Sequence, residues 1–339
     1  MAVDASRFDF AFIPERPLAE SVGLIRLGES LGYRNAWIPD QGFHRDPFVV
    51  VGHAAAGTSS IGLGVGITSP YTRLPVQIAR AAATVDEVSS SRFKLGLGTA
   101  NVANVLTPLG IPLDRPVGRL RDSISIVRSL LRGEPVNFES ERDVLRNISL
   151  EFTPRRADVP IYIGTRGPGM LALAGEIADG VLIESLFNGD GFSYVFENID
   201  RGAERSGRDL ATFDAVSWQV VQVTDDPAPA LAAKKPWLAR TIQVGPRPAL
   251  ERIGMAPEVL DAVEGHNAAG DRDAAIEAVT DETVLCTMII GRPEEVAERV
   301  GAVLRSRATA MNLLLLGPTQ ELATTLARFA QEVLPLVEA

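Results

Sequence analysis

The chain has 339 residues, of which 46% are hydrophobic, so it is long enough to bury the core of one large α/β domain. Its 43 acidic residues outnumber its 33 basic residues and give a formal net charge of −10, which disfavours a broad nucleic-acid or anionic-membrane surface. The single cysteine, Cys286, excludes an intrachain disulfide framework and a metal site built from several cysteines.

The sequence shows no pattern typical of export, membrane insertion or metal binding. Its first residues, MAVDASRFDFAFIP, do not place a basic segment before a long apolar run, as a signal peptide would. No stretch approaches the roughly 18 uninterrupted apolar residues that a membrane span needs. The three histidines, His44, His53 and His266, are scattered, and no two stand at the spacing of metal ligands. We therefore expect a cytoplasmic protein without a metal site.

Short apolar runs alternate with longer amphipathic segments along most of the chain. The runs predict strands over residues 8–14, 35–40, 61–68, 93–99, 159–164, 180–185, 215–224 and 311–317. The amphipathic segments predict helices over residues 17–32, 47–58, 74–89, 117–132, 167–178, 192–206 and 319–337. Strands that alternate with helices of this length pair in parallel through right-handed crossovers. The pattern predicts an α/β fold, a (β/α)8 TIM barrel, in a single domain over residues 1–339.

A doubly wound open sheet is the alternative fold, but it usually carries a G-x-G-x-x-G turn, and none follows the first strand. Two segments interrupt the alternation. Residues 133–158 are polar and form an excursion before the fifth strand. Residues 225–283 hold several prolines between short helical stretches, and we interpret them as a helical insertion in the seventh crossover. Such an insertion at the catalytic end of a barrel forms a lid, or it serves packing or dimerisation.

Catalytic and binding residues of such barrels lie at the carboxyl ends of the strands. The candidates at these ends are Asp40, Gln41, Gly66, Ile67, Thr68, Ser69, Thr99, Ala100, Asn101, Gly164, Thr165, Arg166, Gly167, Glu184 and Ser185. The third strand is unusual because Gly62, Gly64 and Gly66 stand at every second position, on one face. Interior glycines mark a bulge or a backbone that is closely approached. A flat ring pressed against Gly66 is one such neighbour, and tight packing against adjacent strands is the alternative.

The fifth strand end predicts a phosphate site. The segment YIGTRGPGM, residues 162–170, presents backbone N–H groups, the side chain of Arg166 and the start of a helix at one place. Unpaired N–H groups and the helix dipole both favour an anion. The glycines can also serve loop geometry alone, but the position at the mouth of the barrel favours binding.

The segment IGLGVGITSPYTRLPVQIARAAATVDEVSSSRFKLGLGT resembles the third-strand to fourth-strand region of the luciferase-like flavin and deazaflavin oxidoreductases. VPIYIGTRGPGMLALAGEIADGVLIES is similar to the fifth-strand to sixth-strand region of the same group, and LGYRNAWIPDQ to its second strand. Within this superfamily the chain most resembles the methylenetetrahydromethanopterin reductases, which use the deazaflavin coenzyme F420. The resemblance spans about residues 8–186, and the segment IIGRPEEVAERV resembles the family more weakly.

The resemblance implies a non-prolyl cis peptide bond between Gly66 and Ile67, in a bulge that supports the back face of the deazaflavin. It also implies that the turn from Gly164 to Gly167 contacts the phosphate and that Asp40 lies beside the ring. We expect Asp40 and Asn101 to polarise or orient the substrate. The expected cofactor-binding residues are Gly66, Ile67, Thr68, Thr99, Gly164, Thr165, Arg166, Gly167 and Glu184.

Two positions depart from the reductase pattern. The family has a glutamate on its first strand, implicated in proton handling, where this chain has Ala11. The Gly-Pro-Gly-Asp that follows its fourth strand is replaced by Thr99, Ala100 and Asn101, so a second acid becomes an amide. Since protonating or positioning an imine nitrogen needs an acid in reach, these losses argue against the same pterin chemistry.

The leading hypothesis is therefore a coenzyme F420-dependent oxidoreductase that transfers a hydride between the deazaflavin and an organic small molecule. One alternative is an FMN-dependent monooxygenase that takes reduced flavin from a partner reductase and uses O2. Another is a non-catalytic flavin-binding protein on the same barrel, to which the replacements at Ala11 and Asn101 give some weight. Because relatives of this kind are often dimers, we expect a homodimer.

Overall fold

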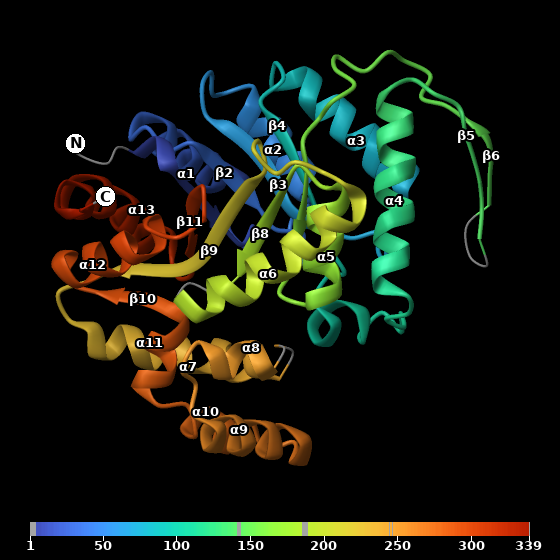
Figure 1. The fold of residues 1–339 in the computed structure, drawn as a ribbon. Helices are drawn as coiled ribbons and strands as arrows, with labels where there is room; N and C mark the ends of the chain where they lie inside the picture. The colour runs from blue at the N-terminus through green and yellow to red at the C-terminus, as the bar shows by residue number, and fades with distance from the viewer. Residues whose placement is uncertain (1–4, 141–143, 185–188, 244, 246, 339) are drawn as a thin grey trace.

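The computed structural model describes residues 5–140, 144–184, 189–243, 245 and 247–338 (Figure 1). Its barrel is built from β1 (Phe8–Phe12), β2 (Asn35–Ile38), β3 (Gly62–Thr68), β4 (Phe93–Leu97), β7 (Ile161–Gly164), β8 (Gly180–Glu184), β9 (Asp214–Val223) and β11 (Ala310–Leu315). Within the described residues these eight strands pair in parallel in that order, and β11 pairs with β1, so the sheet closes on itself. The predicted (β/α)8 TIM barrel is confirmed.

Helices follow the barrel strands and cover their outer face. They are α1 (Leu18–Ser30), α2 (Pro47–Ala55), α3 (Pro75–Val88), α4 (Pro116–Leu131), α5 (Pro168–Ile177), α6 (Gly189–Ser206), α12 (Pro293–Leu304) and α13 (Thr319–Arg328). Most of them begin at a proline, whose missing N–H group costs nothing in the first turn. No helix in the described part of the chain has both the length and the apolar content of a membrane span.

Short turns extend both ends of this helical layer. A 3-10 turn, Ala5–Arg7, precedes β1. The predicted helix over residues 319–337 is regular only as far as Arg328. It continues as a π-helical turn, Phe329–Val333, and a 3-10 turn, Leu334–Leu336. Pro335, in the 3-10 turn, lacks the N–H group that a further α-helical turn would need.

Side chains alternate between the two faces of β1. Phe8 and Phe10 point outward, where their ring centroids lie 5.1 Å from that of Phe329 and 5.4 Å from that of Tyr33. Asp9, between them, points into the barrel and accepts hydrogen bonds there from side chains of β2. The outer face therefore forms the apolar core under the helices, while the inner face carries polar and small residues.

The polar excursion over residues 133–158 contains an antiparallel hairpin that the sequence did not predict. Its strands are β5 (Val136–Glu139) and β6 (Val144–Ile148), and Figure 1 shows them reaching out beyond α4. The strands have four and five residues and alternate weakly between apolar and polar side chains.

The seventh crossover holds the expected helices and an additional strand. It contains α7 (Pro227–Ile242), α8 (Arg247–Arg252), α9 (Pro257–Ala269), α10 (Arg272–Glu277), α11 (Asp281–Thr287) and β10 (Met288–Gly291). In Figure 1 these helices gather beside one end of the barrel, next to β10. β9 has ten residues and pairs with β8 only as far as Trp218, so its second half offers an edge to β10. The sequence did not predict this strand. Whether the helices form a lid or a dimer element stays a prediction.

Glycines of β3 face the barrel interior, where indole rings fill the space above them. A Cβ atom built on Gly64 would lie 2.2 Å from Cε3 of Trp37, and one built on Gly66 would lie 2.9 Å from the same atom. Gly66 also faces Trp218, since its Cβ would lie 3.1 Å from Cζ2 of that ring. Of the two interpretations of these glycines, tight packing inside the barrel therefore accounts for the missing side chains.

We expect Gly64→Ala to lower the free energy of unfolding by about 1–3 kcal/mol, because the added methyl group forces Trp37 out of its position. The matched control is Gly23→Ala on α1, where, apart from the adjoining residues and backbone of its own helix, no atom of the described residues lies within 4 Å of the added Cβ. Replacing this helical glycine raises the free energy of unfolding by about 0.5–1 kcal/mol. Urea denaturation measures both. A Gly64→Ala protein as stable as Gly23→Ala would contradict the packing.

Candidate active site

β3 ends in a bulge, as the sequence led us to expect. The peptide bond between Gly66 and Ile67 is cis, and the register of β3 against β4 shifts at this point. The N–H of Asp40, which follows β2, donates to the carbonyl oxygen of Ile67 at 3.1 Å. On the other side, the N–H of Gly98 donates to the carbonyl oxygen of Thr68 at 3.0 Å. Both neighbouring strand ends thus hold the bulge, and the predicted cis bond is confirmed.

The side chain of Ile67 lies across the ends of β4 and β7. A Cβ atom built on Gly164 would lie 2.5 Å from Cγ2 of Ile67, and one built on Gly98 would lie 3.0 Å from its Cγ1. These glycines leave the room that Ile67 occupies, and the side chain stays partly exposed. The strand ends therefore present a platform of backbone and one aliphatic side chain, on which a flat ring can pack.

Asp40 lies at this rim, and its carboxylate is engaged within the protein. Its Oδ2 accepts hydrogen bonds from Oγ1 of Thr68 at 2.8 Å and from Nε of Arg73 at 2.9 Å. Arg73 also donates to Asp46 at 2.7 Å and lies 5.4 Å from the centroid of the Phe48 ring. Burial by itself lowers the pKa of Arg73, but its bonds to Asp46 and Asp40 raise it above its ordinary value. No sequence pattern indicates the role of Arg73, because the ion pair joins two loops.

The loop after β4 brings Thr99, Ala100 and Asn101 to the same rim. Oδ1 of Asn101 accepts the N–H of Asn104 at 2.9 Å and so caps a π-helical turn, Val102–Leu106. The Nδ2 group is the part of Asn101 that remains to donate to a substrate. Ala100 has a φ of 64°, a conformation that favours glycine, and the reductase pattern has glycine at this place. Oγ1 of Thr99 lies 3.4 Å from the carbonyl oxygen of Ala100.

The predicted phosphate loop joins β7 to α5. The N–H of Thr165 donates to the carbonyl oxygen of Leu182 at 3.1 Å, which fixes the loop to β8. The N–H of Gly167 donates to Oγ1 of Thr165 at 3.1 Å. α5 then begins at Pro168 without a side-chain cap, so the N–H groups of its first turn point to the rim without an intrahelical partner.

Arg166 supplies the positive charge of this loop. Its Nη2 lies 3.9 Å from Oε2 of Glu184, at the end of β8. Its Nη1 is buried and has no hydrogen-bond partner among the described residues. Leaving such a donor unpaired costs about 1–3 kcal/mol, and more when it is charged, so the guanidinium is suited to an anion. Ser185, expected at the same strand end, lies outside the described residues.

Two further polar groups inside the barrel are unpaired, and the sequence analysis missed both. Strand register places Asn312 of β11 between Asp9 of β1 and Trp218 of β9. Since Asp9 and Trp218 both contact Trp37, Asn312 faces the same interior. Nδ2 and Oδ1 of Asn312 and Nε1 of Trp218 are buried without a partner in the described part of the chain. Alternation along the strands would have assigned both to the inner face.

The described residues include no group of three or more His, Cys, Asp or Glu side chains placed to hold a metal ion. The polar groups of the rim, in contrast, gather from β2, β3, β4, β7 and β8. Hydrogen bonds and packing connect each of these strand ends to the next. The structure therefore brings the predicted site residues that it describes to one edge of the barrel.

Comparison with known proteins gives this site its context. A family model described as luciferase-like monooxygenase matches residues 6–310. The chain belongs to this family. It is 33% identical over 307 residues to a 5,10-methylenetetrahydromethanopterin reductase of Archaeoglobus fulgidus, covering 89% of this chain and 91% of the relative. It is 29% identical over 346 residues to an F420-dependent glucose-6-phosphate dehydrogenase of Beutenbergia cavernae, covering 97% and 95%.

A solved structure that resembles this luciferase-like protein indicates the same family as its sequence relatives do. The coenzyme F420-dependent tetrahydromethanopterin reductase from Methanopyrus kandleri matches with a TM-score of 0.85 and 27% identity, over 99% of this chain and 100% of that one. The expected family and the expected enzyme class, a luciferase-like oxidoreductase, are confirmed. The non-catalytic interpretation is therefore set aside.

We expect Asn312→Leu to leave the free energy of unfolding of the cofactor-free protein unchanged or higher, because it replaces an unpaired buried amide with an apolar group of similar size. The matched control is Asn198→Leu. Asn198 is also buried, but it donates to Tyr194 at 2.8 Å and accepts from Arg201 at 3.0 Å. Its replacement lowers the free energy of unfolding by about 1–3 kcal/mol. Equal losses for the two variants in urea denaturation would show that Asn312 is paired.

Proposed function

We propose that the protein is a coenzyme F420-dependent oxidoreductase, which transfers a hydride between the deazaflavin and an organic small molecule. The observation that carries the proposal is the bulge at Gly66–Ile67, whose platform shares one rim with Arg166 and the uncapped start of α5. A flat ring that bears a phosphate on a flexible tail fits these two features together. Two of the similar proteins depend on F420, which supports the same cofactor.

The residues of the rim divide between cofactor and substrate. Bound F420 would supply the hydride donor or acceptor at C5, and the protein positions it. Ile67 and the bulge would support the back face of the ring, while Arg166 and the first turn of α5 would hold the phosphate. Asp40 and Nδ2 of Asn101 would orient the substrate on the open face. The proposed cofactor-binding residues are Gly66, Ile67, Thr68, Thr99, Gly164, Thr165, Arg166, Gly167 and Glu184.

We propose a substrate other than a methylene-pterin. Ala11 is fully buried on β1 where the reductase pattern has a glutamate, and Asn101 stands where it has an acid. Neither side chain can donate a proton to an imine nitrogen. A substrate that requires positioning by an amide donor, without a proton from these two places, fits the residues present.

The family description favours one second candidate, an FMN-dependent monooxygenase supplied with reduced flavin by a partner reductase. FMN also combines a flat ring with a phosphate, so the rim alone accommodates either cofactor. Consumption of O2 in the presence of reduced FMN separates the two candidates, because the F420-dependent enzyme would leave O2 unused.

We further propose that the enzyme acts in the cytoplasm as a homodimer. Phe43, Val49 and Leu74 are 62%, 61% and 53% exposed near the starts of α2 and α3, where a second copy would cover them. For the insertion in the seventh crossover we propose a lid. Nζ of Lys234 on α7 donates to the carbonyl oxygen of Leu316 at 2.8 Å, which fixes the insertion to the loop after β11, at the carboxyl end of the barrel.

Equilibrium titration tests the cofactor assignment. We expect the purified protein to bind F420 more tightly than FMN, and Arg166→Gln to raise the Kd for F420 by about tenfold or more, as the loss of one charge-assisted phosphate contact would. The same variant should bind the phosphate-free deazaflavin as the wild type does. The matched control is Arg307→Gln, which removes a surface ion pair with Asp200 and should change neither Kd. Tight FMN binding without F420 binding would overturn the assignment.

A further inference from the structure

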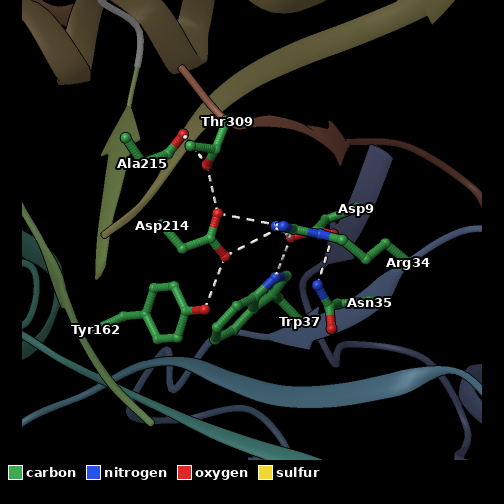
Figure 2. Close-up of polar contacts among 8 residues, drawn as sticks. All are labelled: Asp9, Arg34, Asn35, Trp37, Tyr162, Asp214, Ala215 and Thr309. Atoms are coloured by element: carbon green, nitrogen blue, oxygen red, sulfur yellow. Dashed lines mark hydrogen bonds and ion pairs between the residues drawn. The ribbon is translucent and has the colours of Figure 1, made fainter. Parts of the chain in front are cut away.

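A buried carboxylate on β1 anchors the inner face of the barrel (Figure 2). Asp9 is 0% exposed and accepts four hydrogen bonds. Nε and Nη2 of Arg34 donate to it at 2.7 and 2.9 Å, and Nδ2 of Asn35 donates at 2.7 Å. The fourth donor is Nε1 of Trp37, at 2.9 Å from Oδ2. The carboxylate therefore connects the chain just before β2 with an indole in the centre of the barrel.

A second carboxylate completes the network on the opposite side of Arg34 (Figure 2). Asp214 accepts from Nη1 of Arg34 at 3.2 Å and from the hydroxyl groups of Thr309 and Tyr162, at 2.5 and 2.8 Å. Burial opposes ionisation of Asp214, but Arg34 and these hydroxyl groups lower its pKa below the ordinary value. Burial and Asp214 together raise the pKa of Tyr162, so the tyrosine acts as a donor. Asp214 makes no hydrogen bond with Trp37 among these contacts, whereas Asp9 does.

Trp37 connects this network to the proposed cofactor platform. Its ring atoms occupy the space over Gly64 and Gly66, where Cβ atoms would lie 2.2 and 2.9 Å from Cε3. On its other sides it meets Tyr162 and Trp218, with ring centroids 5.2 and 6.4 Å away. The bond from Nε1 to Asp9 is the polar contact that fixes which edge of the indole faces β3. A rotation of the indole would move ring atoms against the backbone of Gly66, the first residue of the bulge.

We propose that Asp9 is a positioning residue for the cofactor. It acts through Trp37, whose ring fixes the position of the Gly66 backbone and so of the bulge on which the cofactor ring lies. The inference rests on the proposed function, because it needs a ring bound on that platform. A buried ion pair adds little stability over apolar residues of the same volume, so stability alone is a weak reason for Asp9 and Arg34. The direction of the indole, in contrast, depends on an acceptor at this one place.

A double-mutant cycle on cofactor binding tests the proposal. Asp9→Asn replaces one acceptor oxygen with a donor group, and Trp37→Phe removes the indole N–H. Each single variant should raise the Kd for F420 by about tenfold, and the double variant should bind no more weakly than Trp37→Phe alone. Both should also change the circular dichroism that the bound deazaflavin acquires from its surroundings, which a change in stability alone would leave as in the wild type.

The matched control is Asp86→Asn, because Asp86 is 1% exposed and pairs with Arg156 at 2.8 Å, outside this network. It should lower the melting temperature and leave the Kd unchanged. An Asp9→Asn protein that behaves in the same way, or additive effects in the cycle, would overturn the proposal. If Asp9→Asn does not fold, the Kd of Trp37→Phe for F420 is the test by itself, and a value equal to that of the wild type overturns the proposal.

The experiment also separates this inference from the proposed function. A wild-type protein that binds FMN and not F420 contradicts the cofactor assignment, and the same cycle measured with FMN then supports or overturns the role of Asp9. A wild-type protein that binds neither cofactor overturns both.

Discussion

The indole of Trp37 lies against the backbone of Gly64 and Gly66, and those two glycines leave the space that it fills. This contact places a wide, rigid side chain in the middle of the barrel, where layers of branched aliphatic residues more often pack. β2 and β3 pair directly through their backbones, so the hydrogen-bond ladder sets their spacing and the indole fills the interior face of β3 up to Gly66, where the bulge begins.

Charged and polar groups lie on both sides of the Trp37 ring along the barrel axis. Towards the amino ends of the strands lie the paired charges of Asp9, Arg34 and Asp214, which close the barrel with their bonds satisfied. Towards the carboxyl ends lie groups whose bonds are incomplete, among them Arg166 and the first turn of α5. Groups in a satisfied network have no hydrogen bonds left for a ligand, whereas unpaired donors at a rim are available to one. The unpaired donors at the rim agree with the proposed site at the carboxyl ends of the strands, where barrels of this type carry it.

Much of the fold was predictable, because the barrel strands are continuous apolar runs and the helices between them begin at proline or polar residues. β5 and β6 were not, since their side chains alternate only weakly between apolar and polar, and β10 forms only because β9 is long enough to offer it an edge. The cis bond at Gly66–Ile67 came from the family resemblance, as no local pattern specifies it.

The site was predictable as a set of strand ends, but the contacts within it were not. Glycine spacing on β3 suggested a closely approaching neighbour without showing that the neighbour is Trp37, which comes from another strand. Asp40 was expected beside the substrate, which stays a prediction, but no sequence pattern showed that its Oδ2 accepts hydrogen bonds from Thr68 and Arg73. Such pairings join residues that are distant in the chain, so composition and periodicity do not reveal them.

A crystal structure of the protein with F420 would show whether the deazaflavin lies on the bulge with its phosphate at the start of α5. We expect the ring to contact Ile67 and the backbone of Gly66, and the phosphate to accept hydrogen bonds from Arg166 and the N–H groups that follow Gly167. A ring bound away from β3, or a phosphate held by another loop of the barrel, would rule out this arrangement.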